Sequence, residues 1–301
     1  KQQKKPPIGR QGRIPRKSNS GHAKTLLGSR KLSGKERLTM YTIESRVRYS
    51  EVTKNQTLDL YAILNYFQDC SNFQSADLGV GVQYLTARSR AWLLSAWQVE
   101  LADAPRLFDP ISVGTWPYDF KGMYGYRNFI LYNESKNHEV AAYANSIWFL
   151  VDTKSGRPLR VTKEDAAPYK LEPAYPMDYA PRRITLPKHP TDRTDGLLPP
   201  DNQARGTTFA PAFACPPVPV TKMFLDTNNH VNNAQYVHIA QSCLPDDFRV
   251  RRMRAEYRHA AVLGDTICPV RIPDTGQNRY YICLNSRDGG IYAVVEFTAG
   301  G

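Results

Sequence analysis

The chain has 301 residues, 41% of them hydrophobic, with 18 tyrosines and 11 phenylalanines, enough for one large domain or two of ordinary size. No run approaches the ~20 apolar residues of a membrane-spanning helix, so no membrane span is predicted. The net charge of +12 lies almost wholly in residues 1–39, which hold 12 lysines and arginines and one glutamate. The remaining body is nearly neutral, which argues against a nucleic-acid partner.

The basic segment 1–39 is rich in Gly, Ser and Pro and has hardly any aliphatic stretch, so we expect it to be disordered. Its composition loosely fits a transit peptide. It fits equally well a sequence translated upstream of the natural start, because Met40 is the first methionine and strand-like sequence begins there. We favour the second interpretation and exclude the segment from the fold.

Residues 40–165 are predicted to form a first folded unit. Residues 41–52 alternate like a strand, and residues 58–79 carry a helical stripe that includes Leu60, Ile63 and Phe67 and ends at Gly79. Strands are then predicted over residues 91–101, 111–116, 125–133 and 139–152, separated by turn sequences rich in Asn, Asp, Ser and Gly.

A proline-rich linker is predicted over residues 166–213, and a second unit, residues 214–301, repeats the order of the first. The predicted elements are a strand over 217–226, a helix over 232–245 stopped by Pro245, and strands over 248–262, 266–273, 280–285 and 291–299. Aligning the two copies sets Glu51 opposite Asp226 and Asn55 opposite His230. The predicted fold class is α+β, two copies of a long helix wrapped by an antiparallel sheet, joined edge to edge.

Five cysteines, including Cys243, show no C-x-x-C pair and no spacing typical of metal ligands. We interpret them as free thiols in a reducing compartment. We expect no cofactor and no metal site.

From about Met40 to the C-terminus the chain resembles the acyl-acyl carrier protein thioesterases, which are double-hotdog enzymes, and the bacterial-type branch fits best. The blocks that carry the resemblance are AWLLSAWQVEL, TWPYDFKGMYGYRNF, ANSIWFLVDTKSGRPLRV, LEPAYPMDYAPRRITLP and LDTNNHVNNAQY. The resemblance implies two hotdog repeats, an acyl-chain pocket in the first and a catalytic motif in the second.

The decapeptide FLDTNNHVNN, residues 224–233, concentrates short polar side chains where a strand meets a helix. Asn232 or Asn233 can cap that helix. Asp226, Asn228 and His230 recur at every second position, a spacing that can place three side chains on one side of an extended backbone. The resemblance implies that Asn228 and His230 are catalytic and that Asp226 supports them. An imidazole moves protons near neutral pH, and an amide can orient water or donate to an oxyanion.

The sequence departs from the family at the expected general base. Alignment through EYRHAAVLGD places Ala260 at the acidic position and Ala261 at the cysteine that follows it in plant members. Glu256, four residues earlier on the predicted strand, is a poor substitute because it would lie ~13 Å away. Cys243 is a formal candidate nucleophile that we interpret as structural. Three explanations stay open: a slower enzyme using His230 with Asp226, an inactivating change, or a local error of register.

The leading functional hypothesis is hydrolysis of acyl-acyl carrier protein thioesters, which releases free fatty acid and terminates fatty acid synthesis. The alternatives are a catalytically impaired acyl-binding hotdog protein, hotdog hydratase chemistry, and nucleic-acid binding through the tail. The predicted partner is an acyl carrier protein with a phosphopantetheine-linked acyl chain, and a homodimer is one option. The expected location is the bacterial cytoplasm, or a plastid if the tail is a transit peptide.

Two groups of side chains are expected to serve that hypothesis. An apolar tunnel in the first repeat would hold the acyl chain, and basic surface residues would steer the acidic carrier. The tunnel candidates are Trp92, Trp97, Trp116 and Trp148; the surface candidates are Arg127, Arg182 and Arg183.

Overall fold

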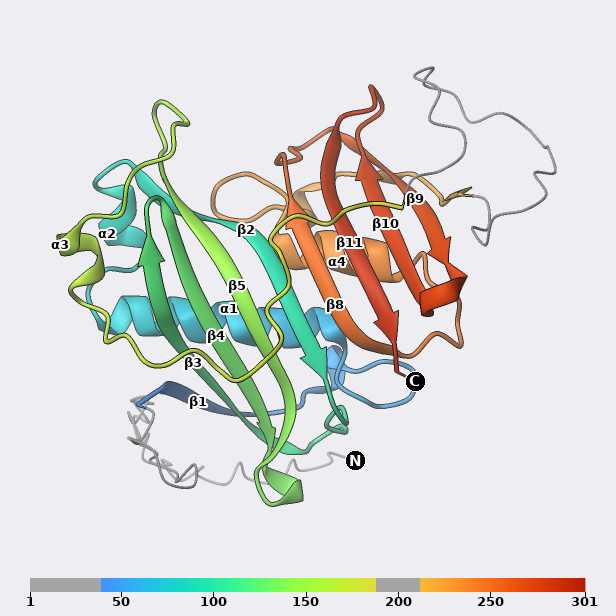
Figure 1. Cartoon of the computed structure of the whole chain (residues 1–301), viewed down its shortest axis with the longest axis horizontal. Coiled ribbons are helices and arrows are strands. Elements are labelled where there is room, and N and C mark those ends of the chain that lie inside the picture. Colours follow the sequence, from blue (N-terminus) through green and yellow to red (C-terminus); the bar gives the residue numbers. More distant parts are fainter. Residues whose placement is uncertain (1–38, 188–211, 301) are drawn as a thin grey trace, which may run out of the picture.

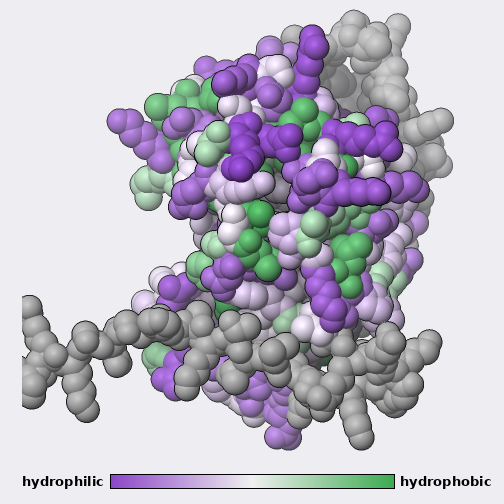
Figure 2. All heavy atoms as spheres, turned by 90° about the vertical axis from the view of Figure 1, so that its left-hand side faces the viewer, coloured by the Kyte–Doolittle hydropathy of each residue, from purple (hydrophilic) through white to green (hydrophobic). Residues whose placement is uncertain are grey.

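A computed structural model describes residues 39–187 and 212–300 and contains two helix-and-sheet repeats that follow each other along the chain (Figure 1). The tail predicted at residues 1–39, apart from Thr39, lies outside the described residues, as does the part of the linker between 188 and 211. No helix in the described ranges is long and apolar enough to cross a membrane. The face on the left of Figure 1 is mostly hydrophilic, with small scattered hydrophobic clusters (Figure 2).

The N-terminal repeat wraps a long helix in a five-stranded sheet, as predicted. Its elements are β1 (Tyr41–Arg46), η1 (Tyr49–Glu51), α1 (Leu60–Asp77), α2 (Val82–Thr86), β2 (Arg90–Leu101), β3 (Pro110–Lys121), β4 (Tyr124–Asn133), η2 (Glu134–Lys136) and β5 (Glu139–Asp152). The Asp59 side chain caps α1 by accepting from the Tyr61 N–H at 3.0 Å. Gly79, with φ of 73°, follows the helix in the left-handed conformation that glycine adopts without strain. The predicted first strand ends at Arg46, because the chain enters the 3-10 turn η1.

The C-terminal repeat is smaller and its helix shorter. Its elements are β6 (Phe213–Ala214), β7 (Val218–Pro219), η3 (Lys222–Phe224), α4 (Asn233–Gln241), β8 (Val250–Tyr257), β9 (Thr266–Asp274), η4 (Thr275–Gln277), β10 (Arg279–Asn285) and β11 (Ile291–Ala299). The strand predicted over residues 217–226 is wrong beyond Val218–Pro219, because Pro217 and Pro219 supply no backbone N–H and the chain then turns through η3. The helix α4 ends at Gln241, before Pro245.

The two repeats share one continuous sheet, so the predicted edge-to-edge pairing is confirmed. Strand order is β1-β3-β4-β5-β2-β8-β11-β10-β9-β6, with β7 also paired to β9. The junction is the antiparallel pair of β2 and β8, whose register runs from Ala96 opposite Glu256 to Glu100 opposite Arg252. Each repeat thereby covers the edge strand that the other would expose.

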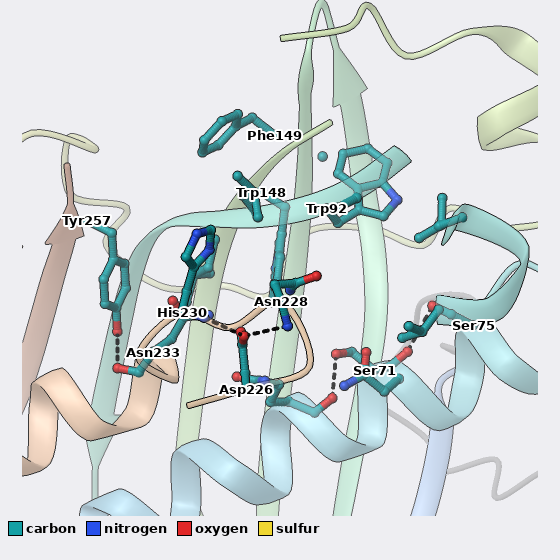
Figure 3. Close-up of a pocket in the computed structure, with 18 of the residues that line it drawn as sticks. Ser71, Ser75, Trp92, Trp148, Phe149, Asp226, Asn228, His230, Asn233 and Tyr257 are labelled. Atoms are coloured by element: carbon teal, nitrogen blue, oxygen red, sulfur yellow. Dashed lines mark hydrogen bonds between the residues drawn. The ribbon is translucent and has the colours of Figure 1, made fainter. Parts of the chain in front are cut away.

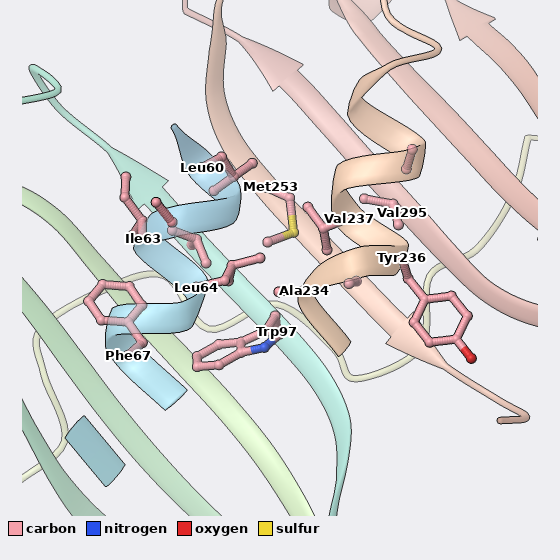
Figure 4. Close-up of a cluster of buried hydrophobic side chains, with 14 of the residues drawn as sticks. Leu60, Ile63, Leu64, Phe67, Trp97, Ala234, Tyr236, Val237, Met253 and Val295 are labelled. Carbon is pink, nitrogen blue, oxygen red and sulfur yellow. The ribbon is translucent and has the colours of Figure 1, made fainter. Parts of the chain in front are cut away.

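The core lies between the two helices and the concave face of the sheet (Figure 4). On α1, Phe67 is fully buried and packs against Trp97 of β2 and Phe129 of β4, with ring centroids 6.2 and 5.2 Å apart. On α4, Val237 is fully buried in the same cluster as Met253 of β8. Truncating a buried side chain of this kind to alanine typically costs about 2–5 kcal/mol.

The predicted linker starts at the last residue of α3 (Lys163–Ala166) and then crosses the outer face of the sheet as an extended segment (Figure 1). Side chains of the sheet fix its backbone along the way. The Trp116 Nε1–H donates to the Pro173 carbonyl at 2.9 Å, the Gln98 amide donates to the Asp178 carbonyl, and Glu256 accepts from the Ile184 N–H at 2.9 Å. The segment therefore crosses from the first repeat to the second over the β2–β8 junction.

Candidate active site

The loop from Asp226 to Asn232 is a tight turn whose shape depends on one carboxylate. The Asp226 Oδ1 accepts from the Asn228 N–H at 2.8 Å and from the His230 N–H at 3.3 Å. The Asp226 N–H donates to the His230 carbonyl at 2.7 Å, which closes the turn. Asn229, with φ of 59°, takes the left-handed position that asparagine tolerates. Asp226 thus holds the loop backbone.

Asn232 and Asn233 connect this loop to α4. Asn232 is the N-cap, and its Oδ1 accepts from the Ala234 N–H at 2.9 Å. The Asn233 backbone N–H, the first of the helix, has no acceptor in the part of the chain that the structure describes. It lies at the positive end of the helix dipole, where negative charge is stabilised.

A cavity of about 690 Å³ extends from this loop into the N-terminal repeat. Asp226, Asn228 and His230, the three residues predicted from the sequence, all line it. Figure 3 shows the loop with its two hydrogen bonds to Asp226, between Ser71 and Ser75 of α1 on one side and Trp92, Trp148 and Phe149 of the sheet on the other. No residue in the described ranges hydrogen-bonds the His230 imidazole, which leaves its ring nitrogens available to a ligand or water.

Two of the four predicted tunnel tryptophans line the cavity. Trp92 of β2 and Trp148 of β5 contribute to its wall. Trp97 and Trp116 do not: Trp97 packs in the α1 core, and Trp116 points to the outer face, where it holds the linker. Trp116 therefore lies on the opposite face of the sheet from the cavity, whereas Trp97 lies on the inner face but in the part that the α1 core fills.

The position of the missing acid lies at the cavity wall. Ala260 lines the cavity, and the adjacent Ala261 N–H donates to the Tyr236 hydroxyl at 2.7 Å. Among the described residues that line the cavity, Asp226 is the only carboxylate. Water activation by a second carboxylate therefore has no candidate in this wall.

Glu256 lies elsewhere, and the expectation that it shares a strand with Ala260 is wrong. Strand β8 ends at Tyr257, and the chain then turns away. The Glu256 carboxylate faces the linker, where it accepts from the Ile184 N–H and pairs with Arg258 at 3.2 Å. It does not line the cavity.

Cys243 also lies away from the cavity wall. Its thiol is buried at the end of α4, and burial raises its pKa to about 12. A thiol held protonated at neutral pH is a poor nucleophile. These observations support the structural interpretation of this cysteine.

Three residues of the site were not found from the sequence. Tyr236 of α4 holds the turn at Ala261, and the Tyr257 O–H donates to the Asn233 carbonyl at 2.9 Å (Figure 3). Burial raises the pKa of Tyr236 to about 12 and that of Tyr257 well above its usual value, so both phenols stay protonated. His259, next to Ala260, is a second imidazole in the cavity wall. Its place beside the missing acid could have suggested it.

The first repeat contains a loop with the same backbone hydrogen bond as the loop Asp226–Asn232, but the predicted alignment of the two is wrong by two residues. Isolated bridges join Val52 to Leu58 and Leu225 to Val231, and each helix cap, Asp59 or Asn232, follows its bridge. Asp226 therefore corresponds to Thr53 rather than Glu51. By the same register His230 corresponds to Thr57 rather than Asn55.

Of the three arginines expected at the surface, only Arg183 is exposed. Arg182 is half-buried and donates to the Ser95 hydroxyl at 3.2 Å. Arg127 is only 8% exposed and lines the cavity, so its assignment to a carrier-docking surface is wrong. In the described residues no group of three His, Cys, Asp or Glu side chains could hold a metal ion.

The fold is a double hotdog, as predicted, and solved structures of thioesterases share it. The structure of an acyl-ACP thioesterase from Bacteroides thetaiotaomicron superimposes with a TM-score of 0.71 at 19% identity, over 87% of this chain and 98% of the other. The 12:0-ACP thioesterase from Umbellularia californica gives a TM-score of 0.68 at 16% identity, over 86% and 96% of the two chains. The predicted fold class, an α+β tandem hotdog, is confirmed.

The predicted resemblance to acyl-acyl carrier protein thioesterases is confirmed at the level of sequence. Residues 39–169 match the model of the acyl-ACP thioesterase N-terminal domain. Two chloroplastic acyl-[acyl-carrier-protein] hydrolases of Cuphea viscosissima, FATB3 and FATB2, are each 24% identical, over 64% and 70% of this chain. The aligned regions cover 43% and 50% of those relatives, so the chain spans about half of their length.

Proposed function

We propose that the protein hydrolyses acyl-acyl carrier protein thioesters to a free fatty acid and the carrier thiol, and thereby terminates fatty acid synthesis. The proposal rests on one observation: Asn228 and His230 line the same cavity as side chains from the interior of the first repeat. The thioester would lie at the loop, with the acyl chain between α1 and the sheet beside Trp92 and Trp148. The names of the matched family and of the Cuphea relatives support this reaction class.

In the proposed mechanism, the His230 imidazole accepts a proton from a water molecule as that water attacks the thioester carbonyl carbon. The carbonyl oxygen becomes an oxyanion, which the Asn228 amide and the Asn233 backbone N–H stabilise by donating hydrogen bonds. Collapse of the intermediate breaks the carbon–sulfur bond, and His230 returns its proton to the departing thiolate. One thioester and one water thus yield one fatty acid and one thiol.

Because Ala260 stands at the acidic position, the proposal includes a modest rate of thioester hydrolysis. With Asp226 committed to the loop backbone, His230 works without a second carboxylate in the described wall. General acid–base catalysis by a positioned group contributes typically ~10²–10⁴-fold, so losing one participant leaves room for a slower enzyme. The second candidate function, an impaired acyl-binding protein, is favoured by the same alanine, and turnover separates the two.

The proposed partner is an acyl carrier protein whose phosphopantetheine arm delivers the thioester to the loop. Arg183, which is exposed, is the basic residue kept from the predicted docking set. A homodimer remains part of the proposal. For location we propose the bacterial cytoplasm, with a plastid as the alternative suggested by the chloroplastic relatives.

The test is thiol release from a ladder of acyl-carrier substrates, followed with a thiol reagent. Wild-type protein should release thiol and free fatty acid in equal amounts, and His230→Ala should lose this activity. A binder would retain the acyl chain without releasing thiol, which would favour the second candidate. An unchanged rate in His230→Ala, with the fold intact by circular dichroism, would remove the mechanism.

A further inference from the structure

One cation inside the cavity, the guanidinium of Arg127, has no counter-charge among the residues that the structure describes. Arg127 lies in the middle of β4, where it pairs with Pro117 of β3 and Ser146 of β5 in the sheet register. Its side chain faces α1, because Phe129, two residues along the strand, packs on Phe67 of that helix. Arg127 therefore lines the part of the cavity that the acyl chain would enter.

The contacts of Arg127 are all neutral. Its Nη1 donates to the Gln74 amide oxygen and to the Thr115 hydroxyl, and its guanidinium lies 5.6 Å from the centre of the Tyr169 ring. No carboxylate among the described residues lies within ion-pairing distance of it. A guanidinium has five N–H donors. Those on Nε and Nη2 have no acceptor in the described ranges.

The two other arginines of the cavity wall, Arg90 and Arg258, show the usual arrangement, and Arg258 pairs with Glu256 at 3.2 Å. Arg90 of β2 lines the same cavity, but its Nη1 pairs with Asp165 at 2.8 Å. Buried cations are normally paired in this way, because an unpaired charge away from water is costly. Burial lowers the pKa of Arg127, which reflects that cost. Arginine nevertheless keeps its charge in proteins, so a positive charge stands in this wall without a partner.

We propose that Arg127 receives a carboxylate at the far end of the acyl chain, so that the protein prefers ω-carboxyacyl thioesters to simple acyl thioesters of the same length. A terminal carboxylate neutralises the guanidinium and accepts from its free donors in the paired geometry that suits the two groups. A methyl end leaves the cation unpaired. This inference rests on the proposed hydrolase function and adds the substrate class.

The wall around Arg127 fits a polar chain end better than a methyl group. The Ser75 and Tyr169 hydroxyls, both in the lining, bond to each other at 2.9 Å beside it. Such neutral groups can reorient around a carboxylate without adding a competing charge. Apolar rings of the same lining, such as Trp92 and Phe120 with centroids 6.1 Å apart, would contact the methylene groups of the chain.

The experiment compares matched thioesters on one carrier: octanoyl, decanoyl and dodecanoyl, and the ω-carboxy forms of the same lengths. At the best length the wild-type kcat/KM should favour the carboxylated substrate by about tenfold or more. Arg127→Gln should reverse that preference, and Arg127→Lys should keep part of it. Arg90→Gln is the matched control and should leave the ratio of the two kcat/KM values unchanged, because Arg90 already forms an ion pair with Asp165.

A wild-type preference for the simple acyl chain, or an unchanged ratio in a folded Arg127→Gln protein, would overturn the inference. Hydrolysis of neither series would instead refute the proposed function. In that case the binding of free acids to the wild-type protein would test the inference. Decanedioic acid should raise Tm more than decanoic acid does, and an equal or smaller shift would refute the role of Arg127.

Discussion

The two repeats carry loops with the same backbone hydrogen bond, and only the second loop holds the candidate catalytic side chains. In the first repeat the Thr53 N–H donates to the Thr57 carbonyl at 2.9 Å; in the second the Asp226 N–H donates to the His230 carbonyl at 2.7 Å. Gln56 and Asn229 share a φ of 59°. Both repeats therefore form this loop conformation, whichever side chains the loop carries. The two loops differ at four of five aligned positions, and two of these changes, Thr53 to Asp226 and Thr57 to His230, introduce the carboxylate and the imidazole of the candidate active site.

The helices opposite the two loops also differ. The second loop faces Gln68, Ser71, Asn72 and Ser75, which lie from the middle of α1 onward and line the cavity. Counted from the caps Asp59 and Asn232, Gln68 corresponds to Gln241, where α4 ends. The last three of these α1 residues therefore have no helical counterpart in the second repeat. Thr53 and Thr57 do not line the cavity, and their hydroxyls bond to each other at 2.9 Å.

Removing the imidazole is expected to have the largest effect. His230→Ala should lower kcat by about 10²–10⁴-fold, because Asp226, the other titratable side chain of the loop, already accepts from the Asn228 and His230 N–H groups. The matched control is Thr57→Ala at the equivalent position of the first repeat, which should leave kcat within about twofold. The rate of thiol release measures both. Equal losses in the two variants would show that the loops act structurally rather than chemically.

Restoring the acid should have the next largest effect, in the opposite direction. Ala260→Glu places a carboxylate in the cavity wall next to the loop, and kcat should rise by about tenfold or more as water gains a second base.

The first repeat again supplies the control for this gain. The Leu58 N–H donates to the Pro105 carbonyl, and at the equivalent position the Val231 N–H donates to the Ala261 carbonyl. Pro105 therefore corresponds to Ala261, and the residue before it, Ala104, corresponds to Ala260. Ala104→Glu should not change kcat. A fall in kcat for Ala260→Glu would show that the acidic position is not a base in this chain.

Some features of the two repeats could be predicted from the sequence and others could not, because only some of them leave a recognisable pattern of residues. The helix α1 was predicted because its apolar residues recur with helical spacing and Gly79 marks its end, and Asp226, Asn228 and His230 were predicted from their alternation. The alignment of the two loops failed by two residues, because nothing in the sequence marks where the 3-10 turns η1 and η3 end. Arg127 was placed at the surface because a strand's period of two does not say which face is inside.

Loss of the loop carboxylate should have a smaller effect than loss of the imidazole. Asp226→Ala removes two acceptor contacts, to the Asn228 and His230 N–H groups, and should lower kcat about tenfold by loosening both side chains. Thr53→Ala, the matched control, removes one contact to the Asn55 N–H at 3.2 Å and the bond to Thr57. It should affect stability only. If Asp226→Ala behaved like Thr53→Ala, Asp226 would not position the catalytic groups.

The smallest effects should come from the helix caps, and they separate stability from activity. Asp59→Ala and Asn232→Ala each remove one acceptor from a helix N-terminus and should each lower the free energy of unfolding by about 1 kcal/mol, measured by urea denaturation. Only Asn232 adjoins the Asn233 N–H at the cavity, so only Asn232→Ala should also lower kcat, by a few-fold. Equal kcat values in the two variants would remove the Asn233 N–H from the proposed oxyanion site, because both variants disturb a helix end to the same degree. A loss confined to Asn232→Ala would show that the second repeat uses its cap both to begin a helix and to orient a donor, whereas the first repeat uses its cap only to begin one.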